Sequence, residues 1–254
     1  MRFRSLFAAL VAATALAVLA TGCSDDGSPF GPGGALNQTD ADDAVVQATI
    51  SLSGLQSTLD ATSSVGTSTV ADTAWTQGNL TFQLTRRWFD AAGTPQALPT
   101  ATTDSIEVTT RVFGSDSTAR WAATIGHSGR LGIGGLSPAR TALWIDATRA
   151  DTLTTRFTTL GGSTTRWFDA RTLTTVQDVL WTKPTTATYP SAGTVTMVIS
   201  ARRFTSAALT TVDHTFTSVV VVTFNGTRYA HGVVNGTFHY TIDLETGQVT
   251  RGAP

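Results

Sequence analysis

Two Asn-Gly pairs near the C-terminus constrain the fold of this chain more than any other feature. Asn225-Gly226 and Asn235-Gly236 each stand between runs of β-branched and aromatic residues within residues 215–250. Both central residues of a type I′ turn need positive φ, which Asn and Gly adopt readily, so this pattern is the strongest short-range signal of a β-hairpin. The segment therefore predicts three antiparallel strands joined by two tight turns.

Two-residue turns also determine which residues lie opposite one another. They place Val220 opposite His231, and His231 opposite Tyr240, while Arg228 faces Asp243 as an expected ion pair. Because side chains alternate between the two faces of a strand, a slip of one residue would exchange the faces. The predicted core face comprises Phe216, Val220, Val222, Phe224, Tyr229, Val233, Phe238, Tyr240, Ile242 and Leu244.

The same register separates the histidines of this region. His231 and His239 fall on opposite faces, and His214 lies about 20 Å along its strand from the position opposite His231. A zinc site needs three or four ligands around one point, so we expect no metal and no cofactor. His231, on the apolar face, is interpreted as a core histidine rather than a catalytic one.

The rest of the chain is rich in threonine, and its apolar residues alternate with period two from residue 79 onward. This pattern favours an all-β fold, an antiparallel meander of about ten to twelve strands that forms a curled sheet, a sandwich or a partial barrel. With 14% charged residues and a net charge of −1, the composition gives no case for nucleic-acid binding. The expected strands before the C-terminal meander are 79–90, 104–113, 119–127, 141–147, 152–159, 164–169, 176–182, 194–204 and 207–224.

Residues 44–61 fit both a strand and a helix. Alternate apolar residues suggest a strand, whereas a looser spacing of three and four favours one short N-terminal helix. We favour the helix, with Asp42 or Asp43 as its N-cap, followed by a loop over residues 61–73.

The N-terminus carries a targeting signal. Arg2 and Arg4 precede an apolar run over residues 6–19, which is too short to span a membrane as a helix, and the run ends in Leu-Ala-Thr-Gly-Cys at Cys23. This pattern resembles a bacterial lipoprotein signal peptide with its lipobox. The resemblance implies cleavage after Gly22 and acylation of Cys23, which is the only cysteine.

That resemblance sets the expected domain organisation. Residues 1–22 are the signal peptide, residues 23–43 are the lipidated cysteine and a tether rich in Gly, Pro, Asp and Ser, and residues 44–254 form a single β-rich domain. Ser24 resembles the outer-membrane variant of the signal, so we expect a lipid anchor in the outer membrane, facing the periplasm or the cell surface.

Three short motifs of the form Trp-Phe/Ile-Asp-Ala begin at Trp88, Trp144 and Trp167. We interpret each as a strand end at which Trp faces the core and Asp closes a turn. The functional alternative is a set of Trp faces that stack on sugar rings.

The remaining motifs give weaker indications of chemistry. Residues 126–130 (GHSGR) resemble the G-x-S-x-G elbow of serine hydrolases, but Arg130 replaces the second glycine, so a surface turn is favoured. Residues 129–135 (GRLGIGG) indicate a bulge or a close backbone approach. Arginines recur along the expected strands. They could form a ladder that binds an anionic glycan or lipid headgroup, but we favour a solvated face on which they alternate with acidic residues. They are Arg86, Arg87, Arg111, Arg120, Arg156, Arg166, Arg202 and Arg203.

These observations favour a non-enzymatic lipoprotein of the outer membrane with a structural or binding role in the envelope. Its expected partners are the membrane, through the acyl chains on Cys23, and a glycan, lipid or envelope protein. The alternative is a carrier of an apolar ligand or lipid in the curled sheet, similar in broad plan to the half-barrel lipoprotein carriers, although no lid helices are recognisable in the sequence. A hydrolase is the third candidate.

Overall fold

The computed structural model describes residues 37–63, 72–117, 121–158, 165–182, 189–206 and 211–252. Cys23, the predicted signal peptide and residues 23–36 of the predicted tether lie outside these ranges, as does Arg120.

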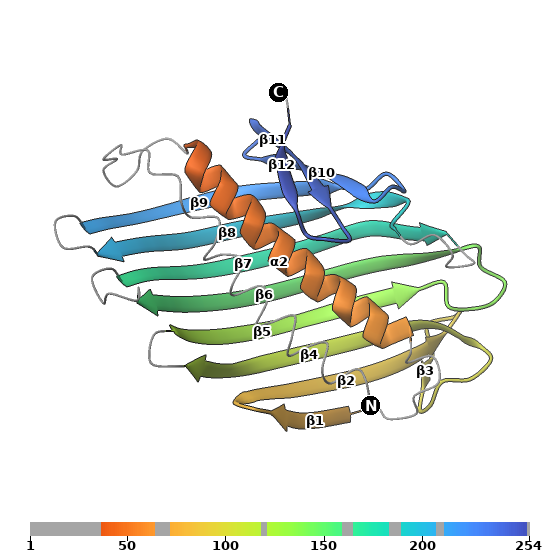
Figure 1. Cartoon of the computed structure of the whole chain (residues 1–254). Coiled ribbons are helices and arrows are strands. Elements are labelled where there is room, and N and C mark those ends of the chain that lie inside the picture. Colours follow the sequence, from red (N-terminus) through yellow and green to blue (C-terminus); the bar gives the residue numbers. More distant parts are fainter. Residues whose placement is uncertain are drawn as a thin grey trace.

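The described residues form one antiparallel sheet and one helix (Figure 1), as the expected all-β meander requires. The sheet has twelve strands in the order β1-β2-β4-β5-β6-β7-β8-β9-β10-β11-β12, with β3 paired to β2, so nearly every strand lies beside its neighbours in sequence. It is curled and open rather than closed into a barrel. The elements are α2 (Gln38–Ser63), β1 (Asp72–Gln77), β2 (Leu80–Asp90), β3 (Pro95–Gln96), β4 (Thr103–Ser117), β5 (Trp121–Gly134), β6 (Ala142–Thr158), β7 (Thr165–Thr182), β8 (Ala192–Ser206), β9 (Thr211–Thr223), β10 (Tyr229–Val234), β11 (Phe238–Asp243) and β12 (Val249–Arg251).

Alternating side chains give the sheet one buried and one exposed face. In β8, Val195, Met197 and Ile199 are fully buried, whereas Val198 and Ser200 between and beyond them are exposed. The buried side is the inner, concave face, and its apolar residues form one core cluster together with residues of α2. Period-two alternation therefore accounts for the burial pattern of these strands.

Several strands are longer than their sequence patterns indicate. The expected strands 141–147 and 152–159 are one strand, β6, and 164–169 and 176–182 are one strand, β7. The intervening segments keep their β-branched residues and pair along their whole length with neighbouring strands. The Trp motif predicts a turn at Asp146, where the chain only bulges, and a second bulge lies beside Asp178.

Two other local predictions are wrong. Residues 126–130 are not a surface turn but the middle of β5, paired on both sides. Strand β1 occupies residues assigned in part to a loop, and Gly78 at φ 59° closes its two-residue turn to β2. The close backbone approach expected within 129–135 is confirmed at Gly135, where a Cβ would lie 2.2 Å from the carbonyl oxygen of Ala142.

Helix α2 lies diagonally across the inner face of the sheet (Figure 1). It has 26 residues, so it is longer than the short helix expected, and it begins at Gln38, within the predicted tether. Its cap is Asn37, whose Oδ1 accepts a hydrogen bond from the Asp40 amide at 2.9 Å, not Asp42 or Asp43. The buried stripe consists of Ala41, Ala44, Val45, Ala48 and Leu52, with the spacing of one helix face.

The first C-terminal turn departs from its prediction. Gly226 has φ 82°, but the β9–β10 connection is longer than two residues, and Val222 lies opposite Gly232 rather than Tyr229. Phe224 is buried and its amide donates to the Gly193 carbonyl, so this segment continues to pair with the start of β8 instead of closing a tight hairpin.

The second turn forms as expected, but with a shifted register. Asn235 and Gly236 have φ of 50° and 70°, and the Thr237 amide donates to the Val234 carbonyl. Val234 nevertheless pairs with Phe238, one residue from the predicted partner.

The two shifts, of three residues and of one, have different consequences for the two strands. A shift by an odd number of residues exchanges the side chains that face the core with those that face solvent. The first shift therefore turns the predicted core side chains of β10 outward, and the second shift restores the predicted orientation of the side chains of β11. Ala230 and Val234 are buried in place of His231 and Tyr229, and Tyr229 is 52% exposed. The expectation that Val220, His231 and Tyr240 lie abreast is therefore wrong. The remaining predicted core residues are buried or pack against the core, except Val233, which is half-buried: Phe216, Val220, Val222, Phe224, Phe238, Tyr240, Ile242 and Leu244.

The three Trp motifs do not share one environment. Trp88 is buried on the inner face, but Trp144 and Trp167 are 36% and 39% exposed on the outer face, contrary to prediction. The expected Asp turn is present after the first motif, where Asp90 Oδ1 accepts hydrogen bonds from the amides of Ala92 and Thr94.

This contrast gives a direct test of the fold. Trp88→Ala should lower the free energy of unfolding by about 3–5 kcal/mol, because it leaves a cavity in the core. Trp167→Ala should lower it by less than about 1 kcal/mol, because the ring lies on the surface. Urea unfolding of both variants measures the difference, and equal losses would contradict the assignment of the two faces.

Candidate functional site

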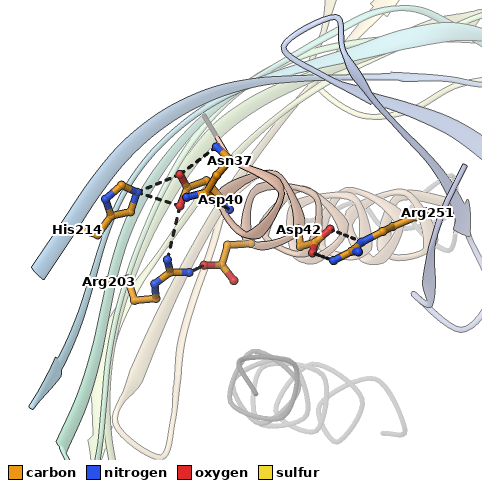
Figure 2. A network of polar contacts seen from close by, with 7 residues as sticks. Asn37, Asp40, Asp42, Arg203, His214 and Arg251 are labelled. Carbon is orange, nitrogen blue, oxygen red and sulfur yellow. Dashed lines mark hydrogen bonds and ion pairs between the residues drawn. The ribbon is translucent and has the colours of Figure 1, made fainter. Parts of the chain in front are cut away.

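The start of α2 is held against the sheet by two groups of charged residues (Figure 2). In the first, Asp40 is almost fully buried and lies 2.9 Å from Nε2 of His214 on β9. Arg203 on β8 lies 3.6 Å from Asp40 and 2.5 Å from Asp43. Burial raises the pKa of Asp43 and outweighs the opposing effect of Arg203.

The second group lies on the other side of the helix and involves the C-terminal strands. Asp42 accepts hydrogen bonds from the Tyr240 hydroxyl at 2.8 Å, from the Gln38 amide at 3.1 Å and from Arg251. Burial opposes ionisation of Asp42, but the hydrogen bond from Arg251 and those from Tyr240 and Gln38 outweigh it, so its pKa is lowered. Burial, together with the nearby Asp42 carboxylate, raises the pKa of Tyr240. Strands β8, β9, β11 and β12 therefore all hold the first turns of the helix.

A third polar group lies under the middle of α2. His127 on β5 is 2.8 Å from Asp151 on β6 through Nδ1, and 2.7 Å from the Thr110 hydroxyl through Nε2. Arg149 donates to Asp151 at 2.9 Å and to the carbonyl of Ser51 in the helix at 3.1 Å. Burial alone would raise the pKa of Asp151, but the hydrogen bond from His127 and the charge of Arg149 outweigh it and lower that pKa.

Thr110, His127 and Asp151 supply a hydroxyl, an imidazole and a carboxylate in the order found in a hydrolase triad. This group does not contain the serine of the G-x-S-x-G elbow considered from the sequence. Ser128, the serine of the G-x-S-x motif, is exposed and adjacent in the strand to His127, so it points to the other face. An elbow also needs a strand-to-helix turn, whereas residues 126–130 are paired along a strand. The Thr110–His127–Asp151 group instead links the sheet to α2 through Arg149.

Several other buried polar atoms of α2 and the inner face have no hydrogen-bond partner among the residues that the structure describes. They are the Gln47 Oε1 and Ser51 Oγ atoms of α2 and the hydroxyls of Thr172, Thr174 and Ser218 on the inner face. A buried polar group without a partner costs about 1–3 kcal/mol. The interface between α2 and the sheet thus stabilises the fold less than a wholly apolar interface of the same size would.

The outer face carries an apolar row across three neighbouring strands. Leu173, Val198 and Val219 are directly paired and all exposed. Nearby, the guanidinium of Arg156 lies over Trp167, 5.5 Å from the ring centroid, and Phe204 packs against the same ring at 5.3 Å. Arg111 over Phe113 and Arg140 over Trp144 repeat this combination elsewhere on the exposed surface.

The arginines predicted from the strands therefore have several environments. Arg202 pairs with Asp213 on the outer face at 2.6 Å, and Arg203 pairs under the helix. Arg111 and Arg156 lie over aromatic rings, an arrangement that hydropathy patterns do not reveal. The expected Arg228–Asp243 ion pair is confirmed at 2.5 Å, although Asp243 lies opposite Tyr229.

The histidines are placed differently from their predictions. His231 is exposed rather than in the core, and its ring stacks on that of His239, so the two share a face. His214 does not approach them but binds Asp40. Within the described ranges, no group of three His, Cys, Asp or Glu side chains could hold a metal ion. Across those same ranges, no helix has both the length and the apolar character to cross a membrane.

Two adjacent arginines test the role of the helix contacts. Arg203→Ala should lower the free energy of unfolding by on the order of 3 kcal/mol, because it leaves the carboxylates of Asp40 and Asp43 without their cation beneath the helix. Arg202→Ala is the matched control and should cause no measurable change, since the Arg202–Asp213 pair is exposed. Equal effects of the two substitutions in urea unfolding would show that the inner contact does not hold the helix.

The lowered pKa values of Asp42 and Asp151 predict acid sensitivity. An acid whose pKa is lower in the folded than in the unfolded chain stabilises the fold above its unfolded value, near 3.8, and this contribution is lost as the pH falls toward the folded value. Asp43 has a raised pKa, so its protonation as the pH falls favours the folded chain and partly offsets this loss of stability. The free energy of unfolding should fall as the pH is lowered from about 4 to about 2, and less steeply in Asp151→Asn. An unchanged slope in that variant would contradict the role of Asp151.

No protein-family model, curated protein or solved structure matches this chain.

Proposed function

We propose that this protein is a non-enzymatic binding protein of the bacterial outer membrane, anchored through acyl chains on Cys23, whose contact surface is the outer face of the sheet. The anchor is supported by the basic N-terminus, the apolar run and the Leu-Ala-Thr-Gly-Cys sequence at Cys23. Its position at the start of the chain would leave the β domain on a tether at the membrane surface.

One observation carries the choice of surface. The chain's own helix lies across the inner face, whereas Leu173, Val198 and Val219 are exposed side by side in the middle of the outer face. Apolar residues scattered singly over a surface need no explanation, but contiguous ones on a sheet are typical of a contact surface. Trp167 and Phe204 form a separate aromatic pair on the same face, six residues further along the same two strands.

The neighbouring side chains indicate what such a surface would contact. Thr152 and Thr217 lie beside the apolar row on the same face, and Thr154 and Arg156 lie further along β6 toward Trp167. Aromatic rings, hydroxyls and arginines together suit a glycan or an envelope protein that presents acidic groups. This agrees with a role in the envelope and needs no reactive group.

A second candidate, a carrier of an apolar ligand, is favoured by α2 itself. The sequence reveals no lid helix, but α2 covers the inner face of the sheet as a lid would. The unpartnered hydroxyls of Thr172, Thr174 and Ser218 beneath it lower the cost of lifting it away. In this role, an apolar ligand would replace the helix against the inner face.

A single preparation tests the proposal. Cys23→Ala should move the protein from the membrane to the soluble fraction of cells, because a domain without its acyl chains has no stable anchor. The released protein is then sedimented with purified peptidoglycan sacculi and with outer-membrane vesicles. We expect it to bind at least one of them, and Leu173→Asp should weaken that binding at least about tenfold by removing the centre of the apolar row.

Leu98→Asp is the matched control, since Leu98 is 50% exposed, against 44% for Leu173, but lies in a loop away from the row. Unchanged membrane retention of Cys23→Ala would refute the anchor. Equal effects of the two leucine substitutions would refute the outer face as the contact surface. Lipid found by mass spectrometry in an extract of the released protein, without any effect of Leu173→Asp, would favour the carrier instead.

A further inference from the structure

Helix α2 has acidic residues at its start and no basic residue along its length. Three of its four acidic residues, Asp40, Asp42 and Asp43, lie in its first two turns, and it contains neither lysine nor arginine. The helix that lies across the inner face is thus itself an anionic amphiphile, with most of its charge at one end. Its apolar stripe packs into the core cluster of the sheet and consists of Ala41, Ala44, Val45, Ala48 and Leu52.

Two basic side chains of the sheet form ion pairs only with the acids of this helix. Arg203 on β8 lies 3.6 Å from Asp40 and 2.5 Å from Asp43 (Figure 2). Nε2 of His214 on β9 lies 2.9 Å from Asp40. Among the residues that the structure describes, no acidic side chain of the sheet pairs with either of them. Displacement of the helix would therefore leave both side chains on the inner face without an acidic partner.

A similar contact lies on the other side of the helix. Arg251 on β12 binds Asp42, and the hydroxyl of Tyr240 on β11 donates to the same carboxylate at 2.8 Å. Arg251 has no other acidic partner within the described ranges. The surface under α2 thus combines positive charge and hydrogen-bond donors at one end with a continuous apolar area beyond them.

The helix does not fit this surface completely. In the described part of the chain, Oε1 of Gln47 and Oγ of Ser51 have no hydrogen-bond partner, and neither do the inner-face hydroxyls of Thr172, Thr174 and Ser218. Most of the buried stripe is alanine, whose methyl group covers less apolar surface than a long hydrocarbon chain does. Both features lower the cost of displacing the helix in favour of a ligand.

We propose that the inner face binds an anionic amphiphile, a molecule with an oxyanion headgroup and a hydrocarbon chain, in the place of α2. The headgroup takes the position of the Asp40 and Asp43 carboxylates beside Arg203 and His214, because both side chains already bind oxyanions there. The hydrocarbon chain lies on the apolar surface against which the helix stripe packs. The site rests on the carrier role given above as the second candidate, and it is independent of the outer contact surface.

Binding of hexadecyl phosphate to the full-length Cys23→Ala protein, which has no acyl chains of its own, tests this site. Hexadecanol and inorganic phosphate are the matched probes, since the first lacks the charge and the second lacks the chain. We expect hexadecyl phosphate to bind saturably and at least about tenfold more tightly than hexadecanol, with no binding of inorganic phosphate at the same concentrations. Amide hydrogen exchange of residues 41–52 should become faster in the complex, because the helix leaves the sheet.

Substitutions on the two sides of the contact should act in opposite directions. Asp43→Asn weakens the hold on the helix and frees Arg203, so hexadecyl phosphate should bind at least about fivefold more tightly. Arg203→Gln removes a headgroup contact, so the preference for hexadecyl phosphate over hexadecanol should fall at least about tenfold. Arg202→Gln loses only an exposed ion pair of the outer face, so this matched control should leave both affinities unchanged. Arg251→Gln, at a more exposed position, should lower the same preference by a smaller factor and keeps the test valid where Arg203→Gln does not fold.

Several results would overturn the proposal. Equal affinities for hexadecyl phosphate and hexadecanol would rule out a headgroup site while leaving the carrier role intact, and the absence of binding of either would remove both. Complex formation without faster exchange of residues 41–52 would place the ligand away from the surface under α2. Inorganic phosphate that binds as tightly as hexadecyl phosphate would show a site for the free ion instead.

Discussion

The fold depends on shielding the apolar inner face of a twelve-stranded sheet from water. Twelve strands with alternating side chains produce a continuous apolar inner surface, and water cannot be left in contact with so large a surface. Closure into a barrel would hide it, but this sheet is open. Helix α2 instead lies across it and contributes Ala41, Ala44, Val45 and Ala48 to the same core cluster. The small side chains let the helix axis approach the strands closely.

Apolar contact alone would not determine where along the sheet this helix lies, because a stripe of alanines is nearly uniform. The charged contacts at its first turns supply that position. Asp40 binds His214 and Arg203 on one side, and Asp42 binds Tyr240 and Arg251 on the other. Buried ion pairs add little net stability compared with apolar substitutes, but removing one partner is costly, so they favour one arrangement over its alternatives. Orientation of the helix is thus their main contribution.

The sequence predicts the fold class and most strands because period-two alternation and turn residues are local properties. Prediction from sequence fails where a contact between residues far apart in the chain determines the local structure. The β9–β10 turn is lengthened because Phe224 bonds to Gly193 on β8, which no local pattern records. Trp144 lies on the outer face, where its ring occupies space that Gly134 of the neighbouring strand leaves open: a Cβ on Gly134 would lie 2.1 Å from the ring. A motif beginning with Trp therefore does not determine which face it occupies.

The residues of the candidate sites are likewise brought together by contacts between distant parts of the chain. The sequence places the Asp residues at the start of α2 at the end of the tether or at the helix cap, and it does not predict their partners, because Arg203, His214 and Arg251 come from strands at least 160 residues away. The closeness of His231 and His239 depends on a one-residue shift in a hairpin, and the tight turn that predicts the hairpin does not by itself determine that shift. The Arg228–Asp243 pair joins neighbouring strands and is predicted correctly, whereas the acylation of Cys23 rests on a local pattern and stays a prediction.

Amide hydrogen exchange of α2, followed by mass spectrometry on the full-length protein, tests the central claim most directly. If the helix covers the inner face as described, amides of residues 41–52 should exchange as slowly as those of the central strands β8 and β9. Arg203→Ala should accelerate exchange in this segment before it affects β8 itself. Rapid exchange of residues 41–52 in the parent protein would show that the helix does not hold this position, and would contradict the account.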